Sequence, residues 1–360
     1  MKTKPHANTH KSSSTQTNVK AKCIKLGIDV HADSYRVVRQ IDDATPQPAQ
    51  KFSPQGFLLW VAKQLDQAES VHSCYEAGPF GYALHRKLQA LGIHNVVICP
   101  QNWDERGKGV KTDKTDALAM AQRLDRYVKG NLKALAVIRV PTVEEEQTRA
   151  QSRQRQQLME HRKRLEAQGR SLMLYNDLRV RGRWWSPHNW PVISRQVSAP
   201  LLELLETFRA LILEVDEKLK DLTRRVEERA GPTPRGFGKL TTQILQDEVG
   251  DWNRFDNRRQ VASLTGLCPG VRASGNSVRT GCITRHGNPR LRRALIELAW
   301  RVIRFQPDYP PVCRWKPVLL SGKGGDRKKA VVAIARKLAI DHWRLVTARC
   351  TAQDLSLKIN

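Results

Sequence analysis

Four acidic residues have the types and spacing of a divalent-metal site. Asp29 follows the apolar run of "CIKLGIDVH", and Glu76 ends the run in "SVHSCYEAG". Asp113 and Asp116 stand three residues apart in "KTDKTDALAMAQ", at the expected start of a helix, and so share one helix face. Carboxylates that converge repel one another unless cations bind, and their hard oxygens suit Mg²⁺. We predict that the four hold Mg²⁺ and act on a phosphodiester, whose attacking and leaving oxygens two such ions stabilise.

Each acid taken singly also has a purely structural interpretation. An aspartate at a helix start caps the helix or interacts with its dipole, and an acid at a strand end is most often a surface charge. Lys111 and Lys114 flank Asp113, and we expect them to contact phosphate rather than to form salt bridges. His31 follows Asp29 by two residues, and we expect it to point to the opposite face of the strand as a packed or hydrogen-bonded histidine.

The elements that must position these acids are those of an α/β domain over residues 22–141. Apolar and alternating runs predict two strands joined by a turn in "CIKLGIDVHADSYRVVRQI", and further strands in "SVHSCYEAG" and "IHNVVICP". Helical spacing occurs in "FSPQGFLLWVAKQLDQA", in "FGYALHRKLQALG" and after Asp113. This order predicts a mixed sheet, in which the carboxyl ends of neighbouring strands and the following helix share one crevice. Residues 1–21 are polar and basic without periodicity, which predicts a disordered tail.

Residues 142–231 are predicted to form a helical arm. Between 147 and 183 the chain has ten Arg or Lys against three Asp or Glu, no proline, and leucines at heptad spacing. "APLLELLETFRALILEVDEKLKDLTRRVEERAG" predicts a second helix. The two helices form either an antiparallel pair within one subunit or a dimerising coiled coil. The aromatic loop "GRWWSPHNWP" between them either stacks on bases or packs the helices together.

Residues 232–350 are predicted to form a mainly helical third domain, followed by a tail at 351–360. "PRGFGKLTTQILQDEVG" has the glycine–apolar–glycine turn of a helix-hairpin-helix element, which presents backbone N–H groups to phosphates. Between 271 and 304 there are eight Arg and one acidic residue. The first half of that stretch is dense in Gly, Ser and Arg, and the second half is an amphipathic helix. "SGKGGDRKKAVVAIARKLAIDHWRLV" predicts a flexible basic loop and a helix.

Charge and composition indicate nucleic acid as the partner. The 360 residues have a formal net charge of +27 and a pI near 10.2, which favours binding to a polyanion. No apolar run approaches the length of about 18 residues that a membrane helix needs, so we expect no membrane segment. The seven cysteines have neither metal nor disulfide spacing, which predicts reduced thiols in a cytoplasmic protein.

These motifs together resemble a known family. "GIDVH", "YEAG", "KTDKTDALA" and "SLTGLCPGVRASGNSVRTGCITRHGNPRLRRAL" are similar to the prokaryotic transposases, or recombinases, of the insertion-sequence 110 family, over most of residues 24–350. The resemblance implies an RNase H-like (RuvC-like) N-terminal domain, a coiled-coil arm and a C-terminal domain with a catalytic serine. It maps the family's DEDD tetrad onto Asp29, Glu76, Asp113 and Asp116, and the serine onto Ser274. It also implies a serine–DNA phosphodiester, a non-coding guide RNA that pairs with donor and target DNA, and a homo-oligomer that is tetrameric in the active complex.

Serine alone is a poor nucleophile, so Ser274 would need activation by the metal site and by neighbouring arginines. Ser277 and Ser263 are alternatives by residue type, and only the family motif favours Ser274. We predict a set of basic residues that contact nucleic acid: Lys111, Lys114, Arg272, Arg279, Arg285, Arg290, Arg292 and Arg293.

Two positions depart from the family pattern. Ala32 stands where members commonly carry lysine, so a basic contact near the metal is either absent or supplied by Lys25 or Arg36. Arg285 replaces a usual lysine, which keeps the charge but changes its geometry. Neither departure removes a tetrad residue or the serine.

Three other functions remain open at this stage. A metal nuclease with the same N-terminal fold would hydrolyse DNA or RNA with an activated water. A non-catalytic protein would only bind nucleic acid. An actin-like ATPase also begins with a "GID" strand, but "VHADS" lacks the glycine expected in its phosphate-binding hairpin.

Overall fold

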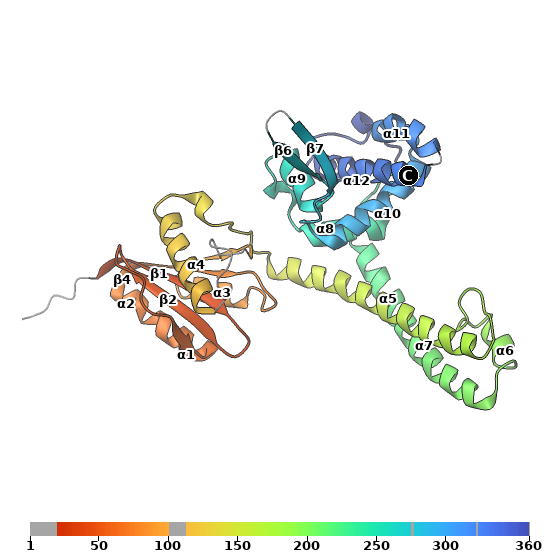
Figure 1. The fold of residues 1–360 in the computed structure, drawn as a ribbon, viewed down its shortest axis with the longest axis horizontal. Coiled ribbons are helices and arrows are strands. Elements are labelled where there is room, and N and C mark those ends of the chain that lie inside the picture. The colour runs from red at the N-terminus through yellow and green to blue at the C-terminus, as the bar shows by residue number, and fades with distance from the viewer. Residues whose placement is uncertain (1–19, 101–112, 275–276, 322, 360) are drawn as a thin grey trace, which may run out of the picture. The chain divides into compact units, whose positions relative to one another are not determined.

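The computed structural model describes residues 20–100, 113–274, 277–321 and 323–359, and of Asp113 and Lys114 only the backbone. The chain divides into two compact units, Met1–Val140 and Pro141–Asn360 (Figure 1).

The first unit is built on a five-stranded mixed sheet with the order β3-β2-β1-β4-β5. β1 pairs with β4, and β4 with β5, in parallel, while β1–β2 and β2–β3 are antiparallel. The predicted mixed sheet is therefore confirmed, and β3 is a short edge strand that the sequence did not predict. The strands are β1 (Ala21–Val30), β2 (Tyr35–Ile41), β3 (Gln50–Phe52), β4 (Ala68–Glu76) and β5 (His94–Ile98).

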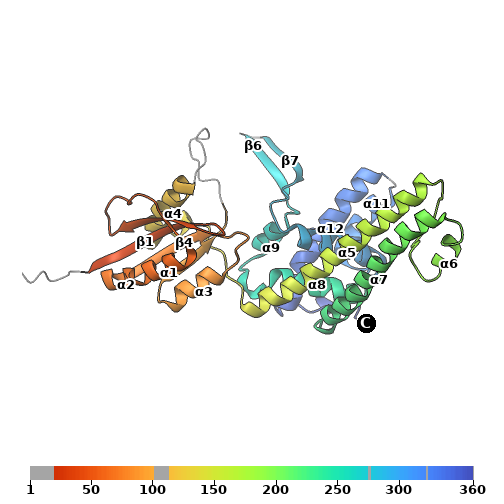
Figure 2. The same cartoon turned by 90° about the horizontal axis from the view of Figure 1, so that it is seen from below.

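Helices cover both faces of this sheet, as Figure 2 shows. Ile24, Leu26 and Ile28 of β1 pack with Phe57 and Leu88 in one core. Those two residues belong to α1 (Pro54–Ala62) and α3 (Ala83–Ala90), with the short α2 (Gln64–Gln67) between them. α4 (Asp113–Val128) covers the opposite face, where Ala117 and Ala121 pack on Val38 of β2. A 3-10 turn (Leu132–Ala134) follows α4.

The second unit begins with an arm of two long helices that pack side by side (Figure 1). α5 (Val143–Tyr175) starts with a capping box in which Thr142 and Glu145 each accept a hydrogen bond from the other's backbone N–H. α7 (Ala199–Glu228) returns after a loop that contains the short α6 (Trp190–Ile193). Trp184 and Trp185 of this loop are buried against Met173, so the aromatic residues pack the two helices together. Close packing is possible because Gly169 has no Cβ, which would lie 2.1 Å from the Trp184 ring.

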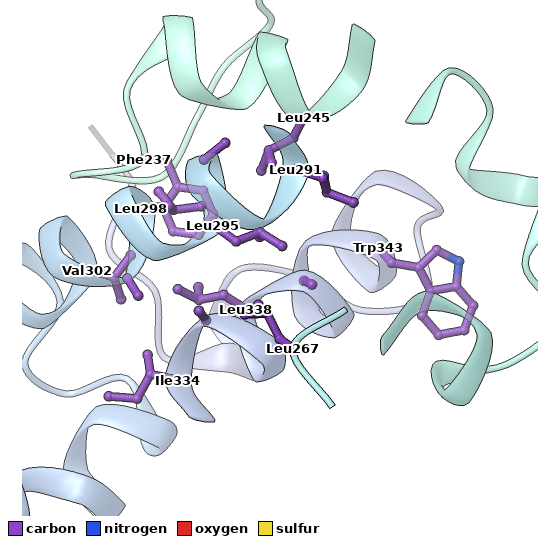
Figure 3. Packing of buried hydrophobic residues seen from close by; sticks show 14 of the residues in the cluster. Phe237, Leu245, Leu267, Leu291, Leu295, Leu298, Val302, Ile334, Leu338 and Trp343 are labelled. Atoms are coloured by element: carbon purple, nitrogen blue, oxygen red, sulfur yellow. The ribbon is translucent and has the colours of Figure 1, made fainter. Parts of the chain in front are cut away.

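The rest of the second unit is mainly helical. Its core lies between α10 and α12, where Leu295, Leu298 and Val302 of one helix meet Ile334 and Leu338 of the other (Figure 3). Gly236 and Gly238, both with positive φ, flank the buried Phe237 in the predicted turn before α8. The elements are α8 (Lys239–Val249), a 3-10 turn (Trp252–Arg254), α9 (Arg258–Thr265), β6 (Pro269–Ser274), β7 (Ser277–Ile283), α10 (Pro289–Phe305), α11 (Pro310–Leu320), α12 (Gly324–Val346) and a last 3-10 turn (Gln353–Leu355).

Three features of this unit differ from the sequence expectations. The Gly-, Ser- and Arg-rich stretch forms a two-stranded antiparallel ribbon, β6–β7. α12 already begins at Gly324, inside the segment predicted as a basic loop. In the segment predicted as a tail, 351–360, Leu355 and Leu357 are buried, and the backbone of Lys358 exchanges two hydrogen bonds with the Gln306 side-chain amide. No helix in the described ranges is long and apolar enough to span a membrane.

Candidate active site

Asp29 and Glu76 lie at the carboxyl-terminal ends of two neighbouring parallel strands. In the β1–β4 ladder Ile28 is paired with Tyr75, so Asp29 and Glu76 are the next residues along the same two strands. Glu76 is the last residue of β4, and both acids are partly exposed at this end of the sheet. Residues that are side by side on two neighbouring parallel strands point to the same face of the sheet. The carboxylates of Asp29 and Glu76 therefore point to the same face.

α4 lies on the face to which Asp29 points. Side chains alternate along a strand, so Asp29 shares a face with Gly27 and Lys25. A Cβ on Gly27 would lie 2.3 Å from the Ala117 carbonyl oxygen, so the helix backbone touches the strand at this point. Asp116, which is partly exposed, immediately precedes Ala117. A glycine inside a strand is the signal of such a close approach, and the sequence interpretation overlooked it.

We define the carboxyl-terminal ends of β1 and β4, together with the first turn of α4, as the carboxylate edge. Asp29, Glu76 and Asp116 each interact with other groups of the chain. Among the side chains that the structure describes, no three His, Cys, Asp or Glu form a cluster ready to hold a metal ion. Asp113 begins α4, but its side chain, like that of Lys114, lies outside the described residues, as does the whole of Lys111.

Two basic residues behave differently from each other at this edge. Arg36 of β2 is directly paired with Asp29 in the antiparallel ladder, so its side chain is on the same face as the acid. Lys25 precedes Asp29 by four residues on β1 and is only 3% exposed. Its Nζ lies 2.6 Å from Asp125 Oδ1. Lys25 therefore does not supply a basic contact at the carboxylate edge, whereas Arg36 is placed for one.

His31 corrects the expectation about its direction. Its Nε2 lies 3.1 Å from Asp29 Oδ2, with 49% of the histidine side chain exposed. Residues two apart in an extended chain point the same way, so the predicted opposite face was wrong. The predicted hydrogen-bonded state is confirmed, and its partner is Asp29.

Cys74 and Tyr75, the two residues before Glu76 in β4, are buried. Burial raises the pKa of the Cys74 thiol well above its usual range, and the nearby Glu76 carboxylate adds to the effect. Its Sγ lies 3.6 Å from the Met120 carbonyl oxygen of α4. Burial also raises the pKa of Tyr75 to about 12, and its hydroxyl accepts a hydrogen bond from His85 N. Cys74 and Tyr75 therefore act here as packed, uncharged groups.

Ser274 lies on the β6–β7 ribbon, which we call the serine ribbon. It is the last residue of β6 and is paired with Ser277, while Arg272 is paired with Arg279. These four side chains share one face of the ribbon, and Ala273 and Val278 form a pair on the other. Like charges directly opposite each other are unfavourable in a sheet, so the arginine pair favours an anionic ligand.

The base of the serine ribbon is tightly packed. A Cβ on Gly287 would lie 2.0 Å from the Leu264 carbonyl oxygen, and one on Gly266 would lie 2.7 Å from an Arg292 nitrogen. Arg292 Nη1 donates to the Thr265 carbonyl at 3.3 Å and to the Arg285 carbonyl at 3.5 Å. Arg292 thus holds the ribbon's base in place.

The other arginines predicted to contact nucleic acid differ in whether another side chain of the protein already binds them. Arg290 donates to the Gln156 side chain, and Arg293 pairs with Glu160 at 3.4 Å while remaining 62% exposed. Arg285 is exposed, with a φ of 59°. Arg272 and Arg279 are exposed on the ribbon and form no ion pair with any residue in the described ranges. The exposed arginines of the ribbon are thus the side chains most available to phosphate.

Comparison with known proteins decides the family. The model of the Transposase IS116/IS110/IS902 family matches residues 233–311. A putative transposase of Sinorhizobium fredii, y4rJ, is 33% identical over 317 residues, which cover 79% of this chain and 78% of the relative. The chain belongs to this family of transposases. The transposase for insertion sequence element IS1533 of Leptospira borgpetersenii is 24% identical, covering 88% of this chain and 94% of the relative. The pilin gene-inverting protein of Moraxella bovis is 28% identical, covering 79% and 83%.

The resemblance stated from the sequence motifs is confirmed at the level of the family. An insertion-sequence transposase acts in DNA transposition and binds DNA, in agreement with the net charge of +27. The matched segment of this transposase extends from the turn before α8 through the serine ribbon and α10. The carboxylate edge lies outside that segment.

Proposed function

We propose that this transposase cuts and rejoins DNA strands with Mg²⁺ at the carboxylate edge and with Ser274 as the nucleophile. The observation that carries the proposal is the shared register of Asp29 and Glu76, on a face that α4 covers with Asp116 in its first turn. Acids from two strands and one helix are thereby directed to one end of the sheet. The resulting domain is RuvC-like in our proposal.

The donor set fits a hard divalent cation. The ligands would be the carboxylate oxygens of Asp29, Glu76, Asp113 and Asp116, and the thiol of Cys74, on the same face of β4 as Glu76, is buried. Bound Mg²⁺ would stabilise negative charge on the attacking and leaving oxygens of a phosphodiester. Arg36 would balance the charge of the acids, because it stands opposite Asp29. His31 would hold the Asp29 carboxylate through its hydrogen bond.

Ser274 would form the covalent link to DNA. Its Oγ bonds to phosphorus while the bond from phosphorus to the departing strand's oxygen breaks, and the hydroxyl proton is passed to a base or water. Attack by the hydroxyl of the incoming strand reverses this exchange and frees the serine. Arg272 and Arg279, on the same ribbon face, would offset the phosphate charge.

The partners that we propose are donor and target DNA, an element-encoded guide RNA, and further copies of the chain. The RNA and the tetrameric complex rest on the family resemblance, and the arginine-rich ribbon and the net charge support a nucleic-acid partner. A relative whose printed name is pilin gene-inverting protein supports DNA rearrangement as the outcome.

One substitution separates this function from hydrolysis by a RuvC-like nuclease. The Ser274→Ala protein would be incubated with Mg²⁺, junction DNA and the RNA transcribed from the element's flank, and covalent protein–DNA adducts would be measured on denaturing gels. We expect the adducts to fall by about a thousandfold or more, because no other group supplies the oxygen. Ser277→Ala, across the ribbon, is the matched control and should retain adducts within about fivefold.

The opposite result has a clear meaning. If Ser274→Ala protein continued to cut DNA at the wild-type rate without forming covalent adducts, the nucleophile would be water and the chain would be a metal nuclease. Loss of adducts in Ser277→Ala but not in Ser274→Ala would assign the role to the other serine.

A further inference from the structure

Lys25 and Gly27 of β1 contact α4 at two successive points. Lys25 Nζ lies 2.6 Å from Asp125 Oδ1, near the end of the helix. A Cβ on Gly27 would lie 2.3 Å from the Ala117 carbonyl oxygen and 2.5 Å from the Ala121 nitrogen. The helix therefore runs in the direction opposite to the strand, from Asp125 beside Lys25 back towards Ala117 beside Gly27.

Extending this register reaches the carboxylate edge. A strand rises about 3.3 Å per residue and a helix about 1.5 Å. The step from Gly27 to Asp29 covers about 7 Å, or between four and five residues of the facing helix. Counting back from the contact with Ala117 and Ala121, this step leads into the first turn of α4, which contains Asp113 and Asp116.

The contact at Gly27 brings the helix close but does not fix its position along the strand. Ala117 and Ala121 are fully buried small residues, packed on Val38, and apolar packing is not directional. A helix that slides on such a surface by a fraction of a turn would move Asp116 relative to Asp29. A directional contact is needed to select one register.

The ion pair of Lys25 and Asp125 supplies that directional contact. Lys25 also donates to the Asp42 carbonyl oxygen at 2.8 Å, and Asp125 accepts a second bond from Lys129 at 2.9 Å. Burial alone would raise the pKa of Asp125, but the hydrogen bonds from Lys25 and Lys129 outweigh it and lower the pKa. The ion pair is thus joined to the turn after β2 through Lys25 and to a second lysine through Asp125. In a buried setting, one partner without the other is strongly unfavourable.

We propose that Lys25 and Gly27 are positioning residues of the metal site, because together they set the register of α4 on β1 and hence the separation of Asp116 from Asp29. This inference rests on the proposed function, since it concerns the same carboxylates. Neither residue touches metal or substrate. Gly27 permits the approach of the two backbones, and the ion pair fixes where along the strand it occurs.

Calorimetric titration of Mn²⁺ into the full chain tests the proposal without a DNA substrate. Lys25→Met and Gly27→Ala should each raise the Kd for Mn²⁺ by about tenfold or more, the usual effect of losing groups that orient metal ligands. Lys129→Met is the matched control for Lys25→Met, because it removes the half-exposed lysine from the same aspartate, and we expect a change within about twofold. Leu88→Ala is a control for general destabilisation, because Leu88 packs in the core on the opposite face of the sheet. It should lower the Tm without changing the Kd for Mn²⁺ by more than about twofold.

Each outcome decides between the two proposals. If Leu88→Ala raises the Kd as much as Lys25→Met does, the effect is general destabilisation and the positioning role is overturned. If the wild-type chain binds Mn²⁺ but Lys25→Met and Gly27→Ala do not weaken it, only the positioning role fails. If the wild-type chain binds no Mn²⁺, the metal site itself fails.

A second variant covers the case in which a single substitution prevents folding. Lys25→Met combined with Asp125→Leu removes both buried charges and restores a folded protein, yet it lacks the directional contact. We expect its Kd for Mn²⁺ to remain raised by about tenfold. A wild-type Kd in this double variant would overturn the positioning role.

Discussion

The carboxylate edge and the serine ribbon are built in opposite ways. Asp29 and Glu76 end strands whose residues are buried on both faces, against a helix that approaches to backbone contact at Gly27. Every described residue of the ribbon from 271 to 282 is exposed. Four charged ligands need fixed distances from one another, which close packing and the buried ion pair of Lys25 and Asp125 provide together. A nucleophile can be aligned by its substrate, so an exposed ribbon is sufficient until DNA binds.

We therefore expect substitutions in the two regions to affect activity and stability differently. Substitutions at the carboxylate edge should remove activity without unfolding the chain, while those beneath it should unfold the first unit. On the serine ribbon, substitutions along the exposed strands should leave stability unchanged, and only the base should be sensitive.

The largest effect is expected from Asp116→Ala. DNA cleavage in Mg²⁺ should fall by about a thousandfold or more, because a metal ligand is lost. The Tm should stay unchanged or rise slightly, since one of several mutually repelling carboxylates is removed. Gel assays of cleavage and differential scanning calorimetry measure the two quantities. Asp33→Ala, an exposed acid in the turn after β1, is the control and should cleave normally; full cleavage by Asp116→Ala would remove the metal site from our account.

A smaller effect should separate the core of the first unit from the ribbon. Leu26→Ala, at a fully buried position of β1, should lower the free energy of unfolding by about 2–5 kcal/mol. Val278→Ala, at a position that is 67% exposed, should change it by less than about 0.5 kcal/mol. Urea unfolding monitored by circular dichroism gives both values. A large loss of unfolding free energy in Val278→Ala would contradict this difference between the two regions, because it would mean that the apolar face of the ribbon is covered in solution.

The smallest predicted loss concerns the base of the ribbon. Gly287→Ala places a methyl group against the Leu264 carbonyl and should destabilise the second unit by about 1–3 kcal/mol. Gly281→Ala is the matched control, because its Cβ would meet only the Gly270 carbonyl at an ordinary 3.7 Å, and it should be neutral. The same urea titration tests both. Equal stability of the two variants would show that the base is as free to adjust as the strands.

The sequence was informative where burial leaves a periodic pattern. Apolar runs that end in an acid identified the strands of Asp29 and Glu76, and the heptad leucines identified α5. The serine ribbon escaped because neither of its faces is buried. Its alternation in "VRAS" and "SVRT" was obscured by a composition that is typical of loops. Within the predicted tail, the burial of Leu355 and Leu357 left no periodic pattern to read.

Contacts between distant residues were beyond any local pattern. Lys25 and Asp125 are 100 positions apart, and nothing in the neighbourhood of either residue identifies the other as its partner. The family resemblance named the four acids and the serine, but it carries no information on what sets the spacing of those acids. That spacing depends on strand register, helix direction and a glycine without a side chain, which become visible only in three dimensions.

Because the serine ribbon has one polar and one apolar face, insertions and deletions in β6 are constrained in length. Inserting or deleting one residue in β6 before Ser274 would move the serine to the opposite face of the ribbon, the face on which Ala273 now lies. A change of two residues would move the serine along the ribbon but keep it beside the arginines. Natural variation within this strand should therefore occur in steps of two, whereas the loops that join the surrounding helices can gain or lose residues singly.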